Sequence, residues 1–324
     1  TTTTAAPAKV IELKLSSWVP PQSMVGVMID TWIGRVHDLV GDKVQITHYS
    51  GGTLGANEDH YNLVMDGMAD IGLAGGGPTK WATRASGLPF LFDNAEEAGW
   101  VTWQLIEDFA MDTDWKDIKP LFIVPVALDN LAYNGHPIQT MEDLKGMKIA
   151  TGSDIGLESI KALGATDTYI PAPDMYTALE RGLIDGLATN WEKAFVFKEF
   201  EVTKYRTDKI GFWCNAMIIY MNYDSWNKLP KDVQDAINSV SGLAISREYG
   251  KMMDENDQKF RGIISGADAG AGKDGFYEIT AAERARWKEA TRGVWDSYIE
   301  DANAEGIPGQ EVVDFLLAKI AEYK

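Results

Sequence analysis

The residues best suited to catalysis or metal binding are few in this sequence and stand far apart. The histidines, His37, His48, His60 and His136, form no H-E-x-x-H pair, and the single cysteine, Cys214, allows neither a zinc cluster nor an internal disulfide. No G-x-S-x-G elbow presents a nucleophilic serine. Carboxylates are abundant, but no pair of them is singled out for acid–base chemistry. We therefore expect a protein that is not an enzyme, with a hydrolase or lyase as the alternative class.

Two short segments resemble phosphate or ion loops without completing the motif. In "GAGKD" (270–274), Asp274 stands where a phosphate loop needs Ser or Thr, and the upstream glycine is missing. The segment "DTDWKD" (112–117) has calcium-like acid spacing but lacks the central Gly and the final Glu, which favours a solvated acidic turn. We expect no cofactor.

The charge of the chain narrows its possible partners. It has 324 residues, of which 30 are basic and 48 acidic, with a formal net charge of −18. Nucleic acid requires clustered Lys and Arg, so we expect no nucleic-acid partner. No run reaches the ~20 apolar residues of a membrane span. The start "TTTTAAPAKV" fits an exported, periplasmic protein after signal removal, although an artificial start would look the same.

Hydrophobic periodicity predicts strands that alternate with helices. Residues 10–15 and "KVQITHY" (43–49) are predicted strands, and Ser23 is the predicted cap of a helix over 24–40. This alternation, which continues through the second half, indicates an α/β fold with largely parallel sheets.

The C-terminal third is predicted to be mostly helical. Beyond Pro230 no strong breaker occurs before the glycines at 262–272, which predicts one long helix. Thr280 and Glu283 form a capping box that begins a further helix over about 281–304.

One pattern occurs twice. "DGMADIGLA" (66–74) and "RGLIDGLAT" (181–189) both contain a glycine that ends a helix, two further residues, an aspartate and a short strand. Coincidence is possible because glycine is common at helix ends. We interpret the pair as equivalent turns in two similar lobes, and a cleft between two lobes is a natural site for a small molecule.

Several segments resemble one family. "MEDLKGMKI" (141–149), "ALGATDTYIPAPDMYTALERGLIDG" (162–186) and "NWEKAFVFKEFEVTKY" (190–205) resemble the solute-binding proteins of tripartite ATP-independent periplasmic (TRAP) transporters, the DctP-like family. With matching pieces on either side, the resemblance covers most of residues 10–245.

The resemblance implies a two-lobed periplasmic-binding-protein fold with hinge strands and a long helix spanning both lobes. The expected division is residues 9–126 plus about 216–253 for lobe I, 127–215 plus about 254–280 for lobe II, and 281–324 for C-terminal helices packing on the lobes. It also implies capture of a small-molecule solute and delivery to the membrane permease subunits of a TRAP transporter. We expect a monomer. A sensor subunit that docks on a receptor would have the same sequence features.

Two positions depart from the family pattern. The strand in "KGMKI" usually continues with an arginine that pairs with the ligand's carboxylate, and here that position is Ala150. A second arginine is common shortly before the "PI" dipeptide, where gapless alignment places Asp129. Because an Arg–carboxylate pair is strong and oriented, Ala and Asp in these places should disfavour a simple carboxylate.

The same resemblance places several tryptophans at the expected cleft. Trp18, Trp191 and Trp213 are candidate walls, since Trp attracts cations through its ring face. We therefore hypothesise a cationic or amine-bearing ligand, such as a choline-like quaternary ammonium compound, with Asp129 balancing its charge. Further candidate polar contacts are Glu58, Asp154, Asn190 and Asn215.

Simpler roles and other ligands stay open. A Trp is often a core residue, acids are favourable near helix starts, and Asn190 suits a helix cap. The ligand could instead be a neutral polar or aromatic solute, or a metal-bridged oxoacid of the kind that some relatives bind. An organic acid could be held by Lys80, Arg84 or helix N-termini.

Overall fold

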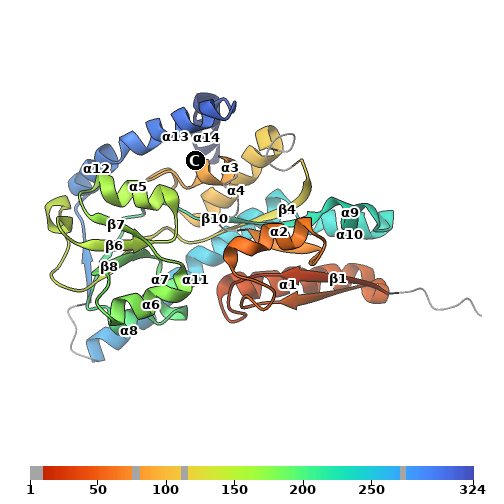
Figure 1. Ribbon diagram of the computed structural model, residues 1–324, viewed down its shortest axis with the longest axis horizontal. Coiled ribbons are helices and arrows are strands. Elements are labelled where there is room, and N and C mark those ends of the chain that lie inside the picture. Colours follow the sequence, from red (N-terminus) through yellow and green to blue (C-terminus); the bar gives the residue numbers. More distant parts are fainter. Residues whose placement is uncertain (1–9, 75–80, 111–115, 271–274) are drawn as a thin grey trace, which may run out of the picture.

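The computed structural model describes residues 10–74, 81–110, 116–270 and 275–324. These residues form two lobes, each built around one β-sheet, with helices packed on the sheets (Figure 1). Most of "DTDWKD" and of "GAGKD", and Lys80, lie outside the described residues.

Lobe I is built on a mixed sheet with the strand order β2-β1-β3-β10-β4. Strand β1 pairs in parallel with β2 and β3, whereas β10 runs antiparallel to β3 and β4. The strands are β1 (Ile11–Ser16), β2 (Val44–Tyr49), β3 (Ile71–Ala74), β4 (Ile118–Pro125) and β10 (Ala216–Asn222). The helices of this lobe are α1 (Met24–Val40), α2 (His60–Met65), α3 (Trp81–Ser86) and α4 (Ala95–Leu105).

Lobe II is built on a sheet with the order β11-β9-β5-β8-β6-β7, in which β5 runs antiparallel to β8 and β9. Its strands are β5 (Asn130–Tyr133), β6 (Lys148–Thr151), β7 (Thr166–Tyr169), β8 (Gly186–Thr189), β9 (Tyr205–Asp208) and β11 (Gly275–Glu278). Its helices are α5 (Asp154–Ala162), α6 (Ala172–Glu180), α7 (Trp191–Val196) and α8 (Glu199–Val202).

The repeated turn is the same structure in both lobes. Gly67 and Gly182 have φ angles of 71° and 66°, a conformation that favours glycine. The carboxylate of Asp70 accepts the Lys14 N–H of β1 at 2.8 Å, and that of Asp185 accepts the Lys148 N–H of β6 at 2.8 Å. In each lobe this aspartate joins the strand it precedes to the parallel neighbour.

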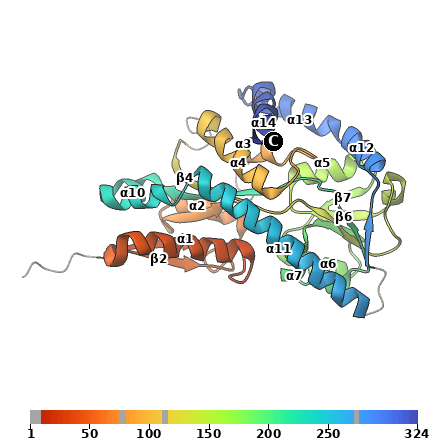
Figure 2. The ribbon, with the colours of Figure 1, turned by 180° about the vertical axis from the view of Figure 1, so that it is seen from behind.

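Helix α11 (Leu243–Gly270) crosses from one lobe to the other (Figure 2). It packs on α4 and β4 in lobe I and on α7 and β11 in lobe II. The prediction of one helix from Pro230 onward is wrong, because α10 (Lys231–Ser239) ends before Gly242, whose φ of 84° separates it from α11. A further short helix, α9 (Tyr223–Asn227), precedes Pro230. Helix α11 continues through Gly262, since an internal glycine costs only about 1 kcal/mol.

Three C-terminal helices, α12 (Ala281–Ala290), α13 (Arg292–Ala304) and α14 (Gly309–Tyr323), pack over both lobes. The predicted helix over 281–304 is broken at Thr291, whose hydroxyl donates to the Trp287 carbonyl and competes with the helix backbone. Half of the predicted capping box forms: Thr280 Oγ accepts the Glu283 N–H at 3.1 Å. The Glu283 carboxylate instead accepts the Met141 N–H of lobe II at 2.7 Å.

The strands of the two sheets fall within the residue ranges expected for the two lobes. The exact boundaries between the lobes stay a prediction. Among the described residues, no helix has the length and apolar character needed to cross a membrane.

Candidate functional site

A cavity of about 360 Å³ lies between the lobes. Lobe I contributes the loops that follow β1 and β2, and lobe II contributes the segments that follow β6, β7 and β8. The two connections between the lobes, around Asp129 and Asn215, complete the lining. The lining therefore gathers at the carboxyl ends of parallel strands, which is the usual place for a ligand in α/β proteins.

Five of the eight predicted site residues line this cavity: Trp18, Glu58, Asp129, Asn190 and Asn215. The remaining three are outside the lining. Asp154 is exposed in the first turn of α5. Burial raises the pKa of Tyr169, a lining residue, and the carboxylates of Asp154 and Glu58 add to this rise.

Asp129 is a buried carboxyl in the wall of the cavity, with 1% of its surface exposed. Its backbone pairs with the opposite connection, since the Asp129 N–H donates to the Trp213 carbonyl at 3.1 Å and the Phe212 N–H donates to the Asp129 carbonyl at 2.9 Å. Burial raises the pKa of this carboxyl, while the ammonium of Lys193 lowers it. Among the described residues, Oδ2 has no hydrogen bond of normal geometry.

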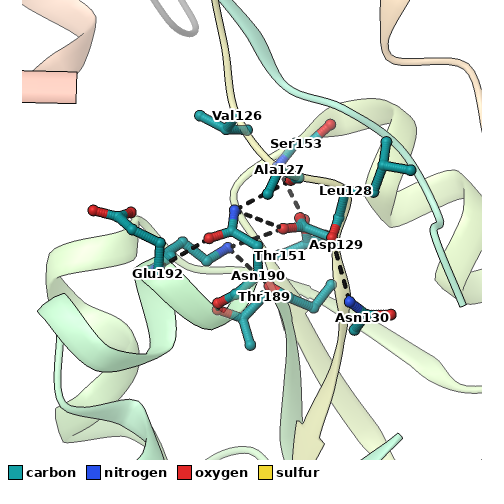
Figure 3. Close-up of polar contacts among 12 residues, drawn as sticks. Val126, Ala127, Leu128, Asp129, Asn130, Thr151, Ser153, Thr189, Asn190 and Glu192 are labelled. Atoms are coloured by element: carbon teal, nitrogen blue, oxygen red, sulfur yellow. Dashed lines mark hydrogen bonds and ion pairs between the residues drawn. The ribbon is translucent and has the colours of Figure 1, made fainter. Parts of the chain in front are cut away.

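Asn190 is both a helix cap and a cavity residue. Its Oδ1 accepts the Lys193 N–H at 2.9 Å and so caps α7. Its Nδ2 donates to the carbonyl of Ala127 at 3.3 Å and lies 3.5 Å from Asp129 Oδ1 (Figure 3). The amide therefore holds α7 of lobe II against the connection that carries Asp129.

Sequence reasoning missed Lys193, the one cationic side chain that the described residues place in the lining. Its Nζ donates to the Ala188 carbonyl at 2.9 Å and lies 3.7 Å from Asp129 Oδ1. The available signal was spacing, because Lys193 follows Asn190 by three residues and therefore lies on the same helix face.

Acidic side chains outnumber this lysine. Besides Asp129 and Glu58, the lining contains Asp174 in the first turn of α6 and Glu192 in the first turn of α7. Glu192 was also missed from sequence. Its Oε1 accepts the Met24 N–H at 2.8 Å, and this contact joins α7 of lobe II to the N-terminus of α1 in lobe I.

The expectation that Trp191 and Trp213 form cavity walls is corrected by their positions. Trp191 is fully buried, and its indole N–H donates to Asp208 Oδ1 at 3.0 Å. Glu192 and Lys193 of α7 line the cavity, and because successive helical side chains are rotated by about 100°, Trp191 lies on the opposite side of this helix. Trp213 stacks on Phe212 in the lobe II core.

Trp213 supports the site from behind, since its indole N–H faces the Asp129 carboxyl and lowers its pKa. Trp18 is the tryptophan that lines the cavity. Its indole N–H has no hydrogen-bond partner among the described residues.

Ala150 and Arg84 also lie away from the cavity. Ala150 is fully buried on β6 in a cluster with Met175 and Leu179, so it fills core space rather than facing a ligand. Arg84 is not a lining residue, and its guanidinium forms ion pairs with Glu158 and Asp301. The hypothesis of a cationic ligand therefore depends on the carboxyl of Asp129 and not on the missing arginine at Ala150.

The described residues contain no group of three or more His, Cys, Asp or Glu side chains arranged to hold a metal ion. The cavity instead offers hydrogen bonds, the two buried carboxyls of Asp129 and Glu192, and an apolar wall to which Trp18, Met175, Phe197 and Met217 contribute. This arrangement can bind a small organic molecule.

Comparison with known proteins decides the family. The model for bacterial extracellular solute-binding protein, family 7 (DctP), matches residues 15–301. The chain belongs to this family. The match confirms the resemblance to TRAP solute-binding proteins, and the two-lobed fold agrees with it. As a member of family 7, the chain is a solute-binding protein and not an enzyme.

Two curated relatives illustrate the range of family 7. The chain is 31% identical over 173 residues to the C4-dicarboxylate-binding periplasmic protein DctP of Rhodobacter capsulatus, a match that covers 53% of this chain and half of that protein. It is 24% identical over 277 residues to the 2,3-diketo-L-gulonate-binding periplasmic protein YiaO of Escherichia coli, covering 82% of each.

Solved family structures match over nearly the whole chain. A TRAP solute-binding protein of Rhodoferax ferrireducens, with copurified benzoate, is 26% identical with a TM-score of 0.90 and covers 97% of this chain and 98% of its own. A marine metagenome TRAP protein specific for aromatic acids, here with 3-hydroxybenzoate, is 25% identical with a TM-score of 0.89 and covers 97% and 99%.

Proposed function

We propose that this protein captures a small organic solute in the periplasm and delivers it to the membrane permease subunits of a TRAP transporter. Family membership and the cavity between the lobes support this role. Uptake of the solute into vesicles containing the cognate permease tests it. Uptake should require the added protein, and uptake that is equally fast without it would contradict the proposal.

For the ligand, the proposal is a small amine-bearing or otherwise cationic solute whose positive group meets Asp129. The carboxyl of Asp129 is buried and lines the cavity, and its Oδ2 makes no hydrogen bond of normal geometry among the described residues, although the Trp213 indole N–H faces this carboxyl. A buried carboxyl gains most from a donor that carries charge. Four acids against one lysine on the described lining favour the same sign of ligand.

Besides these charged groups, the cavity has an apolar and aromatic wall. Trp18 contributes a ring to the same cavity, and cation–π contacts with Trp are worth about 0.5–2 kcal/mol. The volume of about 360 Å³ suits a compact solute. These features together favour a small ammonium compound with an apolar body.

An aromatic acid is the second candidate, because Lys193 lines the cavity and two solved relatives hold benzoate or 3-hydroxybenzoate. The ligands named for these relatives are acids, which gives no support to a cation. In this alternative the carboxylate of the solute would replace Asp129 as the partner of Lys193, and Asp129 would be protonated.

Matched probes distinguish the two candidates. Benzylamine and benzoate share a ring and differ in charge, benzyl alcohol is the neutral control, and choline tests a quaternary ammonium. A probe at a hundredfold excess over its Kd stabilises the protein by about 2.7 kcal/mol, which thermal unfolding detects. We expect benzylamine or choline to raise the melting temperature and benzoate to leave it unchanged.

Two charge-removing variants complete the test. Asp129→Asn should weaken benzylamine binding at least tenfold, whereas Lys193→Met should not weaken it. Stabilisation by benzoate alone, lost in Lys193→Met and retained in Asp129→Asn, would refute the amine and support the acid.

A further inference from the structure

Helix α11 carries two aspartates one turn apart, and each binds the N-terminus of a helix in a different lobe. Asp254 accepts the Ala95 and Glu96 N–H groups at 2.9 and 3.0 Å, at the start of α4 in lobe I. Asp257 accepts the Trp191 and Glu192 N–H groups at 2.6 and 3.0 Å, at the start of α7 in lobe II. Each aspartate thus accepts two backbone N–H groups at the start of a helix, Asp254 in lobe I and Asp257 in lobe II.

Helix α7 depends strongly on this contact. It has six residues, fewer than two turns, and so short a helix has little stability of its own. The first N–H groups of a helix have no partner within it. Asn190 satisfies one of them, on Lys193, and Asp257 satisfies those of Trp191 and Glu192.

The same short helix supplies much of the cavity. Asn190, Glu192 and Lys193 line it, and Glu192 also reaches the Met24 N–H of lobe I at 2.8 Å. A carboxylate on α11 thus holds the start of α7, and a carboxylate on α7 holds the start of α1. By contrast, α4, which Asp254 holds, contributes no residue to the cavity lining.

We propose that Asp257 is a positioning residue of the solute site: it fixes α7 so that Glu192 joins the two lobes and Asn190 and Lys193 face Asp129. It acts through α7 and does not touch the cavity. Its role in ligand binding rests on the proposed capture of a solute between the lobes. The contact between the lobes that it supports can be measured without any ligand.

Residue-resolved hydrogen exchange on the ligand-free protein tests the proposal. In the wild type the amides of Trp191, Glu192 and Met24 should all be protected. Asp257→Ala should speed exchange of the first two at least tenfold. It should also speed exchange of Met24 at least threefold, although Met24 lies in the other lobe and does not bond to Asp257.

Two control variants separate positioning from a local structural role. Asp254→Ala should speed exchange of Ala95 and Glu96 and leave Met24 unchanged. Glu192→Ala should speed exchange of Met24 alone. If Asp257→Ala exposes Trp191 and Glu192 while Met24 stays as protected as in the wild type, Asp257 is only a local cap and the proposal is wrong.

A milder substitution at the same position tests the proposal if Asp257→Ala does not fold. Asp257→Asn keeps Oδ1, the atom that accepts both N–H groups, and removes the charge. Exchange at the same amides, Met24 included, should then rise by a smaller factor than in Asp257→Ala, and an unchanged Met24 would again overturn the proposal. A cation or an acid as the final ligand leaves this outcome unaffected, so the two proposals fail independently.

Discussion

Glu199 is a completely buried carboxyl in lobe II. The Thr189 hydroxyl donates to its Oε2 at 2.8 Å, and Oε1 has no hydrogen-bond partner among the described residues. Burial raises its pKa from the ordinary 4.5 to about 7; the Lys193 ammonium opposes this rise, whereas the carboxylates of Asp129 and Glu192 add to it. The native protein therefore holds a proton on Glu199 that the unfolded chain releases.

The sign of the pH dependence follows from this difference. Between pH 4.5 and about 7 the native state binds more protons at Glu199 than the unfolded state does. The contribution of Glu199 to the free energy of unfolding therefore decreases as the pH rises through this window. Because its pKa rises from 4.5 to about 7 on folding, ionised Glu199 lowers the free energy of unfolding at pH 8 by about 3 kcal/mol.

Glu199→Gln removes the titrating group and keeps an oxygen for the Thr189 hydroxyl. Urea unfolding should show the variant about 3 kcal/mol more stable than the wild type at pH 8, with a difference that shrinks toward pH 4.5. Glu201→Gln, an exposed neighbour, is the control and should show no such trend. Equal stability of Glu199→Gln and wild type at pH 8, with parallel pH profiles, would refute the reasoning.

Three further predictions follow from contacts in the lobes. Trp191→Phe leaves the Asp208 carboxylate without the indole donor, so the free energy of unfolding should fall by about 1–3 kcal/mol while solute affinity stays unchanged. Trp18→Ala removes a ring from the cavity wall and should weaken solute affinity about tenfold in calorimetric titration. Gly250→Ala would press a Cβ into the backbone carbonyl of Ala95, so thermal unfolding should show a loss of about 1–3 kcal/mol. Asp185→Ala should cost about 1–2 kcal/mol in urea unfolding, and the equivalent Asp70→Ala should cost more, because Asp70 also accepts the Ser225 hydroxyl.

Local signals in the sequence predicted local structure well. Ser23 caps α1 by accepting the Gly26 N–H at 3.1 Å, and Gly41 ends the helix with a φ of 58°. Capping is decided within a few residues of chain, so the residue types carry the information. The break at Gly242 was missed because its N–H donates to the distant Leu121 carbonyl of β4. The break at Thr291 was missed although its cause is local, since the Thr291 hydroxyl bonds to the Trp287 carbonyl one turn before.

Some residues named from the sequence line the cavity and others do not. Asp129 and Asn190 were named from their places in a family pattern, and both line the cavity. Trp191 was named because it follows the repeated turn, yet Glu192 and Lys193 are the residues of α7 that line the cavity, which places the Trp191 side chain on the opposite side of the helix. Ala150 was named for its place at a strand end, but its methyl group packs in the core of lobe II.

The sequence by itself determined the alternation of helices and strands, the repeated glycine–aspartate turns of the two lobes and the family. Each of these depends on residue types at short spacing. Only the tertiary structure decided which side chains meet across the cavity. Lys193 and Asp129 are 64 positions apart in the chain, yet Lys193 Nζ lies 3.7 Å from Asp129 Oδ1, and Glu192 reaches Met24 across 168 positions. Such distances are set by how two sheets and one long helix pack together, which no local pattern of residues records.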